Sequence, residues 1–270
     1  MARRPKLPTP PVPSSLRPAP PRPGEGNGKV RPVDHAAEAG TAVVDWVDER
    51  TSLSGAGRWL MFRKVPKGTN WFYTLGSATL FAFLSQAVTG VFLAMYYKPD
   101  PSGGAYESIR HVTNEVFLGQ FVRGMHKWGS SVMVILVFLH MGRTFFFGAY
   151  KYPRELNWVI GVVLLILTMV MSFTGYLLPF DQRAYWATIV GVNINGTGPL
   201  IGPYLSDFLR AGPEFGATTL SRFYAIHMLL VPGAIVALIG AHLYLVTKLG
   251  TTAPPWQKVQ VDEELRKAQA

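Results

Sequence analysis

Long uncharged stretches divide this chain into segments that are long enough to cross a membrane. Three stretches contain no Asp, Glu, Lys or Arg: 68–97, 156–180 and 223–247. About 20 mainly apolar residues span the roughly 30 Å hydrocarbon core of a bilayer. A fourth stretch, 128–142, is shorter, but the flanking Lys127 and Arg143 can extend their charged ends to the interface while aromatic residues continue the segment. The pattern predicts an all-α membrane protein with four transmembrane helices.

The segments outside these spans differ in composition. Residues 1–40 are rich in Pro, Gly and Arg and have few large apolar side chains, which predicts a disordered or partner-bound extension. Residues 41–70 begin with the apolar pattern of an amphipathic helix lying in the membrane interface. The four-helix bundle is expected over 71–250, followed by a polar tail over 251–270. The Gly- and Pro-rich loop at 181–217 is long enough to be a functional cover.

The distribution of basic residues predicts how the chain is oriented. Arg and Lys are concentrated in the N-terminal segment, the 148–157 connection and the tail, whereas the loops at 98–120 and 181–217 are nearly balanced in charge. Because basic loops stay on the cytoplasmic side, we expect both termini on the cytoplasmic, electrically negative side of a bacterial plasma membrane. This bias also accounts for the net charge of +10, so no nucleic-acid partner is predicted. The second and fourth spans then run parallel.

Four histidines lie in these two parallel spans. His126 and His140 are separated by fourteen positions, and His227 and His242 by fifteen. These spacings return to within roughly 40° and 60° of one helix face, and they separate each pair by roughly 21–23 Å along its axis. His126 therefore faces His227 near the positive side, and His140 faces His242 near the negative side. Imidazole is a common axial ligand of haem iron, so the pattern predicts two stacked haem groups.

Two further observations bear on this prediction. A single histidine inside a membrane is more often a satisfied polar group than a ligand, but four at matched depths would each carry a desolvation cost without a shared partner. The chain has no cysteine, which excludes disulfides, thiolate metal sites and thioether attachment of haem.

Paired glycines repeat the histidine spacing on the other two spans. Gly76 and Gly90 are separated by fourteen positions, as are Gly161 and Gly175. Glycine is costly within a helix unless something must approach the backbone closely, although small residues also serve ordinary helix packing in membranes. By the topology, Gly76 and Gly161 lie at the level of the negative-side haem, and Gly90 and Gly175 at the level of the positive-side haem.

Three arginines lie near the ends of the spans and close to the histidines in sequence: Arg123, Arg143 and Arg222. Arginine offers a planar, bidentate partner to carboxylates such as haem propionates. Anchoring at the membrane edge is the alternative interpretation of these residues.

From about residue 44 to residue 250, the chain resembles the amino-terminal half of cytochrome b in its split, four-helix cytochrome b6-like form. The histidine spacings favour this form over the longer fused one. The matching segments are NWFYTLG, QAVTGVFLAMYY, RGMHKW, LHMGR, KYPRELNWVIGVVL, TGYLLPFDQ, YWA and TLSRFYAIH.

The resemblance implies the dihaem subunit of a quinol:cytochrome c, or similar acceptor, oxidoreductase that contributes to proton translocation. Quinol would be oxidised near the positive side, one electron passing to an iron–sulfur protein and the other through the two haems to quinone at the negative side. Gln86 would lie against the positive-side haem. Residues bordering the quinol pocket would be Ala187, Thr188, Ile189 and Val190.

The same resemblance implies several partners. These are a Rieske-type iron–sulfur protein, a separate carboxyl-terminal cytochrome b chain, a c-type cytochrome or equivalent acceptor, lipid, and a second copy in a dimeric complex. The carboxyl-terminal half carries part of the quinol site, so this polypeptide is expected to be inactive alone.

The chain departs from the family pattern at three positions. Thr74 stands where the split form has the cysteine that tethers an extra haem c, and Thr247 replaces an arginine that helps to hold it. We therefore predict two haem b groups and no covalent third haem. Phe180 replaces the usual tryptophan in the LPFDQ segment.

Two other functions fit parts of the pattern. One is a dihaem membrane anchor for a dehydrogenase or hydrogenase, against which the paired glycines and the long loop at 181–217 argue. The other is a haem-free membrane scaffold or transporter subunit.

Overall fold

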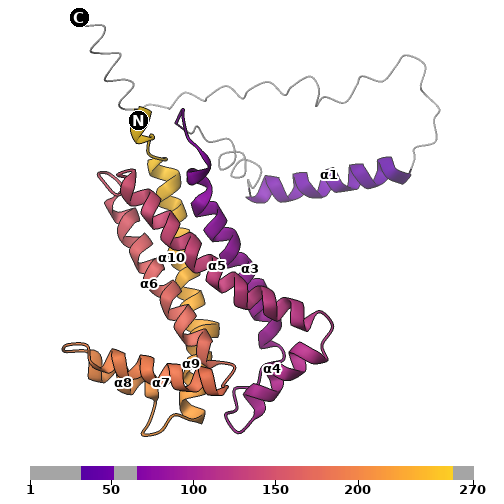
Figure 1. Cartoon of the computed structure of the whole chain (residues 1–270). Coiled ribbons are helices and arrows are strands. Elements are labelled where there is room, and N and C mark those ends of the chain that lie inside the picture. Colours follow the sequence, from indigo (N-terminus) through magenta and orange to yellow (C-terminus); the bar gives the residue numbers. More distant parts are fainter. Residues whose placement is uncertain (1–31, 52–65, 258–270) are drawn as a thin grey trace, which may run out of the picture. The chain divides into compact units, whose positions relative to one another are not determined.

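The computed structural model describes residues 32–51 and 66–257, which belong to two compact units (Figure 1). Parts of the predicted extension (1–31), of the interfacial segment (52–65) and of the tail (258–270) lie outside the described residues.

Helix α1 (Pro32–Thr51) is the described part of the first unit. It begins inside the range predicted for the extension, because proline is favoured in the first turn of a helix. Val43, Val44 and Trp46 are exposed, and the Arg50 guanidinium lies 4.3 Å from the centroid of the Trp46 ring. An exposed apolar surface of this kind fits a membrane interface, which stays a prediction for α1.

Four long apolar helical segments form the second unit, and each is long and apolar enough to cross a membrane. This confirms the four predicted spans and the all-α fold class. The segments are η2–α3 (Trp71–Thr74 and Leu75–Ala94), α5 (Gly119–Phe146), α6 (Glu155–Leu177) and α9–η3–α10 (Ala217–Ala225, Ile226–Leu230 and Val231–Leu249).

The four segments pack as two antiparallel pairs, α3 with α5 and α6 with α10 (Figure 1). Helices α5 and α10 run in the same direction, as the connectivity requires. One apolar cluster joins the two pairs in the middle of the bundle, and its buried members are Ala82, Phe83, Met133, Val137, Ile226, Val231 and Ile235. The parallel helices α5 and α10 are the ones that carry the histidines.

The predicted long loop contains two helices, α7 (Gln182–Gly196) and α8 (Gly202–Arg210). Asp181 caps α7, because its side chain accepts a hydrogen bond of 2.8 Å from the Ala184 N–H. Pro203 lies in the first turn of α8, where proline is tolerated, and therefore does not break the helix. Most of the Gly and Pro residues that indicated a loop lie at the ends of these helices or in the segments that follow them. Together with α4 (Gly104–Asn114), they lie at the lower end of the bundle in Figure 1.

A sharp turn joins α6 to α7 at the LPFDQ segment. The Tyr97 hydroxyl donates a 2.6 Å hydrogen bond to the Leu178 carbonyl, and burial raises the pKa of Tyr97, with a smaller contribution from Tyr224. Phe180 has a φ of 48°, a left-handed conformation that is uncommon for a bulky residue. Its ring packs edge-on against Tyr185 at a centroid distance of 5.8 Å. The Phe180–Tyr185 contact holds the start of α7 against the end of α6, and the Tyr97 hydrogen bond joins the end of α6 to the segment that follows α3.

Candidate cofactor site

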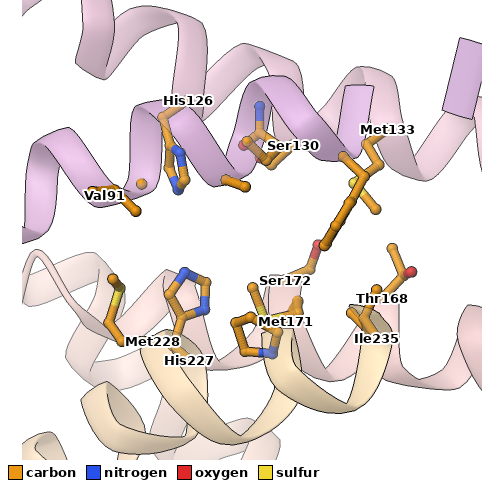
Figure 2. Close-up of a pocket in the computed structure, with 15 residues that line it drawn as sticks. Val91, His126, Ser130, Met133, Thr168, Met171, Ser172, His227, Met228 and Ile235 are labelled. Atoms are coloured by element: carbon orange, nitrogen blue, oxygen red, sulfur yellow. The ribbon is translucent and has the colours of Figure 1, made fainter. Parts of the chain in front are cut away.

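The four histidines lie in two facing pairs. His126 and His140 are on α5, His227 is in η3 and His242 is on α10. The ring centroids of His126 and His227 are 6.4 Å apart, and those of His140 and His242 are 6.5 Å apart, with an interplanar angle of 77° in both pairs. Figure 2 shows the rings of His126 and His227 pointing toward one another across a pocket.

A π-helical turn explains how unequal spacings give equal pairs. In η3 the Val231 N–H donates to the Ile226 carbonyl five residues back, so this turn holds one residue more than an α turn. The fifteen positions from His227 to His242 therefore advance about as far as the fourteen from His126 to His140. Their rotational offset falls from roughly 60° to roughly 40° in magnitude. The apolar pattern along the chain does not reveal this turn.

Two threonine hydroxyls contact the His126–His227 pair. The Thr89 hydroxyl donates to the Ser85 carbonyl at 2.7 Å, and its oxygen lies 2.9 Å from His126 Nδ1. The Thr174 hydroxyl donates to the Val170 carbonyl at 2.8 Å, and its oxygen lies 3.1 Å from His227 Nδ1. Each hydroxyl proton is already used, and the backbones of Gln86 and Met171 also hydrogen-bond to the two rings, so only oxygen acceptors surround Nδ1 and it carries the proton. This tautomer leaves the Nε2 lone pairs free to bind a metal.

The His140–His242 pair has a different environment. The Nδ1 atoms of His140 and His242 are buried and have no side-chain hydrogen-bond partner among the described residues, and only the Asn157 backbone interacts with the His242 ring. Thr89 and Thr174 were not predicted as site residues, although each directly precedes one of the paired glycines.

The paired glycines lie against the histidines themselves. A Cβ atom built on Gly76 would lie 3.1 Å from His140 Cε1, and one on Gly90 would lie 3.2 Å from His126 Cε1. On Gly175 it would lie 2.5 Å from His227 Cε1, whereas on Gly161 it would lie 3.6 Å from His242 Cε1. Three of the four glycines therefore leave room that an imidazole ring uses. The group that approaches the helix backbone at these glycines is the imidazole ring, whereas the sequence predicted that a cofactor would lie there.

The pocket between His126 and His227 is mainly apolar and is lined by α3, α5, α6 and the fourth helical segment (Figure 2). Phe83, Met133 and Met171 are among its apolar lining residues. Gln86 also lines it, and its side-chain amide donates to the Met125 carbonyl at 3.5 Å. The structure therefore places Gln86 beside the His126–His227 pair.

The three predicted arginines differ in what they contact. Arg143 lies 3.8 Å over the Tyr73 ring, and its Nε and one terminal nitrogen are buried without a hydrogen-bond partner among the described residues. Arg123 donates to the Thr113 hydroxyl at 3.1 Å. Arg222 donates to the Phe208 carbonyl. Arg143 is thus the arginine that has buried donors available for an anionic group.

The predicted quinol-pocket residues lie on α7. Thr188 is buried and its hydroxyl donates to the Ala184 carbonyl at 2.8 Å, whereas Ala187 and Val190 are exposed. Ile189 lines a second, more polar pocket that also includes Asn193, Arg210 and Glu214. The four residues therefore do not share one pocket in this chain.

The geometry of each histidine pair fits a haem iron. A metal–imidazole nitrogen bond is about 2.0–2.1 Å long, so a metal midway between two imidazoles separates their centroids by roughly 6.3 Å. No group of three or more metal-binding side chains occurs in the described residues. Bare metal ions in proteins take more side-chain ligands than two, whereas iron in a porphyrin needs only axial ones. The neighbouring glycines and the buried donors of Arg143 fit the same group.

Comparisons with known proteins agree with this geometry. The family model Cytochrome b/b6/petB matches residues 60–250. The menaquinol:cytochrome c reductase cytochrome b subunit of Geobacillus thermodenitrificans is 44% identical over 218 residues, which cover 78% of this chain and 97% of that protein. Cytochrome b6 of Heliobacterium modesticaldum is 43% identical over 215 residues, covering 78% of this chain and 100% of that protein.

A solved structure shares the fold. The chain is similar to one in "Hyperthermophilic respiratory Complex III", with a TM-score of 0.70 and 32% sequence identity. The similarity covers 77% of this chain and 55% of that chain, so this chain spans little more than half the length of its structural relative.

Proposed function

The chain belongs to the cytochrome b/b6 family, and from that premise we propose that it is the dihaem subunit of a quinol:cytochrome c, or similar acceptor, oxidoreductase. Family membership makes it an integral membrane protein of an oxidoreductase complex that binds haem b. The proposal adds two haem groups, electron transfer from a positive-side quinol site to a negative-side quinone site, and a contribution to proton translocation.

The observation that carries the proposal is the match between the two histidine pairs. Centroid distances of 6.4 and 6.5 Å support two metal sites of similar geometry, each with two protein ligands. Haem bound there would supply one-electron transfer chemistry. The spacing along α5 separates the two sites by about 21 Å along the helix axis, which is most of the roughly 30 Å apolar core of a membrane.

The residues of this chain hold and insulate the two groups. His126 with His227, and His140 with His242, provide the axial ligands. The four glycines keep the helix backbones close to the imidazoles, and Gln86 lies beside the positive-side group. Arg143 neutralises a propionate at the negative side, and Arg123 and Arg222 are proposed for the same role at the positive side. Arg123 and Arg222 donate hydrogen bonds to Thr113 and Phe208 in this structure, so they must give up these bonds to bind the propionates.

The location of quinol oxidation follows from the topology. We propose that both termini lie on the cytoplasmic side of a bacterial plasma membrane, which places α7 and α8 on the positive side. The segment 187–190 borders the quinol pocket there. Since the four residues do not share one pocket in this chain, the separate carboxyl-terminal chain supplies the rest of it. A Rieske-type iron–sulfur protein and a c-type cytochrome or equivalent acceptor complete the dimeric complex.

Purification of the intact complex from membranes tests this proposal. We expect two haem b per copy of the chain, and co-purification of an iron–sulfur protein and a smaller membrane chain. Because the chain has no cysteine, no haem should remain bound to it on a denaturing gel. A large cytoplasmic catalytic subunit would instead indicate a dehydrogenase or hydrogenase anchor. Absence of a b-type band in the reduced-minus-oxidised spectrum would indicate a haem-free scaffold or transporter subunit.

A further inference from the structure

The two haem-binding levels differ at one repeated position. On α3 the residue before the glycine is Thr89 at the positive-side level and Leu75 at the negative-side level. On α6 the corresponding residues are Thr174 and Ile160. The repeat of fourteen positions therefore places a hydroxyl beside each histidine of the positive-side pair and an aliphatic side chain in the same position of the negative-side repeat.

The hydroxyls make a specific contact with the ligands. The Thr89 oxygen lies 2.9 Å from His126 Nδ1, and the Thr174 oxygen lies 3.1 Å from His227 Nδ1. Both threonines are buried, with exposed fractions of 6% and 1%. Each also donates to two carbonyls of the preceding turn, so its oxygen is held in the direction of the imidazole. The Nδ1 atoms of His140 and His242 have no side-chain hydrogen-bond partner within the described residues, and only the Asn157 backbone interacts with the His242 ring.

A hydrogen bond accepted from Nδ1–H makes the imidazole a more basic ligand and fixes its ring orientation. A more electron-donating ligand stabilises the oxidised iron more than the reduced iron. We propose that Thr89 and Thr174 are positioning residues that lower the reduction potential of the positive-side haem relative to the negative-side one. The inference rests on the proposed function, because it requires a haem in each pair. Its consequence is that electrons move downhill from the positive-side group to the negative-side group.

Ordinary helix packing is the competing explanation for these threonines. Thr79 and Thr168 also donate to the carbonyl four residues back, at 2.9 and 2.8 Å, which is common for threonine in membrane helices. Neither of them has a hydrogen bond to a histidine among those found in the described residues. Thr79 is on the same helix as Thr89 and is therefore a matched control.

The test is a redox titration of the b-type absorbance in the intact complex. Thr89→Val and Thr174→Val should each raise the potential of the positive-side haem and leave the negative-side haem unchanged. Each lost hydrogen bond is expected to change the electron-sharing equilibrium between the two haems by roughly three- to tenfold. A tenfold change is about 59 mV for a one-electron couple. Thr89→Ser should keep the wild-type potential, and Thr79→Val should have no effect.

A gain-of-function variant tests the same inference from the other side. Ile160→Thr places a hydroxyl at the negative-side position and should lower the potential of that haem. If the valine variants lose the positive-side haem, the potentials measured in Ile160→Thr and Thr89→Ser still test whether the hydroxyls lower the reduction potential. Removing the negative-side haem by replacing His140 identifies which component of the titration belongs to which site.

The outcomes separate this inference from the proposed function. Wild-type complex without two haem b groups contradicts the proposed function itself. Two haem groups whose potentials do not change in either valine variant overturn only the role of the threonines. An equal shift in Thr79→Val would also overturn it, because a hydroxyl elsewhere in the helix would then act without contact to the ligand. No shift in Ile160→Thr would overturn it as well, because a hydroxyl at the matching position would then have no effect.

Discussion

Adding a methyl group at Gly175 should selectively damage the positive-side haem site. A Cβ atom there would lie 2.5 Å from Cε1, 3.1 Å from Nδ1 and 3.2 Å from Nε2 of His227. Ordinary contacts between carbon atoms are about 3.5–4.0 Å, so the ring must move by roughly 1 Å. A metal bond tolerates only about 0.2 Å of such movement. Gly161→Ala is the matched control, because the same atom would lie 3.6 Å from His242 Cε1.

The magnitude follows from these distances. Overpacking of a well-packed site costs about 1–3 kcal/mol. Alanine in a helix interior regains up to about 1 kcal/mol relative to glycine, so the fold should tolerate Gly175→Ala while the ligand geometry does not. Displacing a group that orients a metal ligand typically lowers affinity by roughly 10–100-fold. We therefore expect Gly175→Ala to lose the positive-side haem or bind it weakly, and Gly161→Ala to keep both haem groups.

The assay is the ratio of haem b to protein in the purified complex, together with the redox titration of each component. Gly175→Ala should lose up to half of the b-type absorbance, and the component that remains should have the wild-type potential of the negative-side haem. A Gly175→Ala complex with both haem groups at wild-type potentials would refute the argument. Equal damage from Gly161→Ala would refute it as well, since an added methyl group there would make only an ordinary contact with the imidazole.

Other residues of the site can be tested in the same complex. Replacing His140 by Leu should remove only the negative-side haem and halve the b-type absorbance. The exposed His111 should be replaceable without loss of haem. Loss of both haem groups from the His140 variant with the fold intact would contradict the pairing of the histidines. Arg143→Leu removes a buried positive charge and should lower the potential of the negative-side haem in a redox titration, while Arg143→Lys should retain most of it; an unchanged potential in Arg143→Leu would exclude this role. Deleting Leu229 should convert the π turn into an α turn and leave both haem groups in place. Deleting Ile135 from α5, which has no such turn, should displace one histidine ligand. Equal haem loss from both deletions would contradict the view that the π turn accommodates one extra residue.

Much of the architecture could be predicted from hydrophobicity and spacing. The uncharged stretches identified all four membrane helices, because length and apolar content alone decide whether a segment can cross a bilayer. The connectivity then required α5 and α10 to run parallel. The helices α7 and α8 were not predicted, because Pro203 and the glycines near it indicate a loop by composition but lie at helix ends in the structure. The same residue types are favourable or unfavourable depending on their position in a helix.

The details of the site depended on features that spacing does not report. A π turn is set by backbone hydrogen bonds, which the sequence does not show. A spacing of fifteen positions between two histidines therefore does not reveal that they are as far apart along the helix as two residues fourteen positions apart in an α-helix. The glycines were predicted to face a cofactor, whereas in three of the four cases the imidazole itself occupies the space. Thr89 and Thr174 resemble other membrane threonines until their distance to a histidine is known.

The two sites are linked through the register of the helices. Gly76 meets His140 and Gly90 meets His126, and the intervals of fourteen positions on α3 and on α5 are equal. One antiparallel register between straight helices therefore sets both contacts at once. On α6 the interval between glycines is also fourteen, but the partner histidines are fifteen positions apart. Without the π turn, a register that placed His227 against Gly175 would leave His242 about one residue out of place. The extra residue in η3 thus lets two helix pairs with unequal sequence spacing present imidazoles at the same two depths.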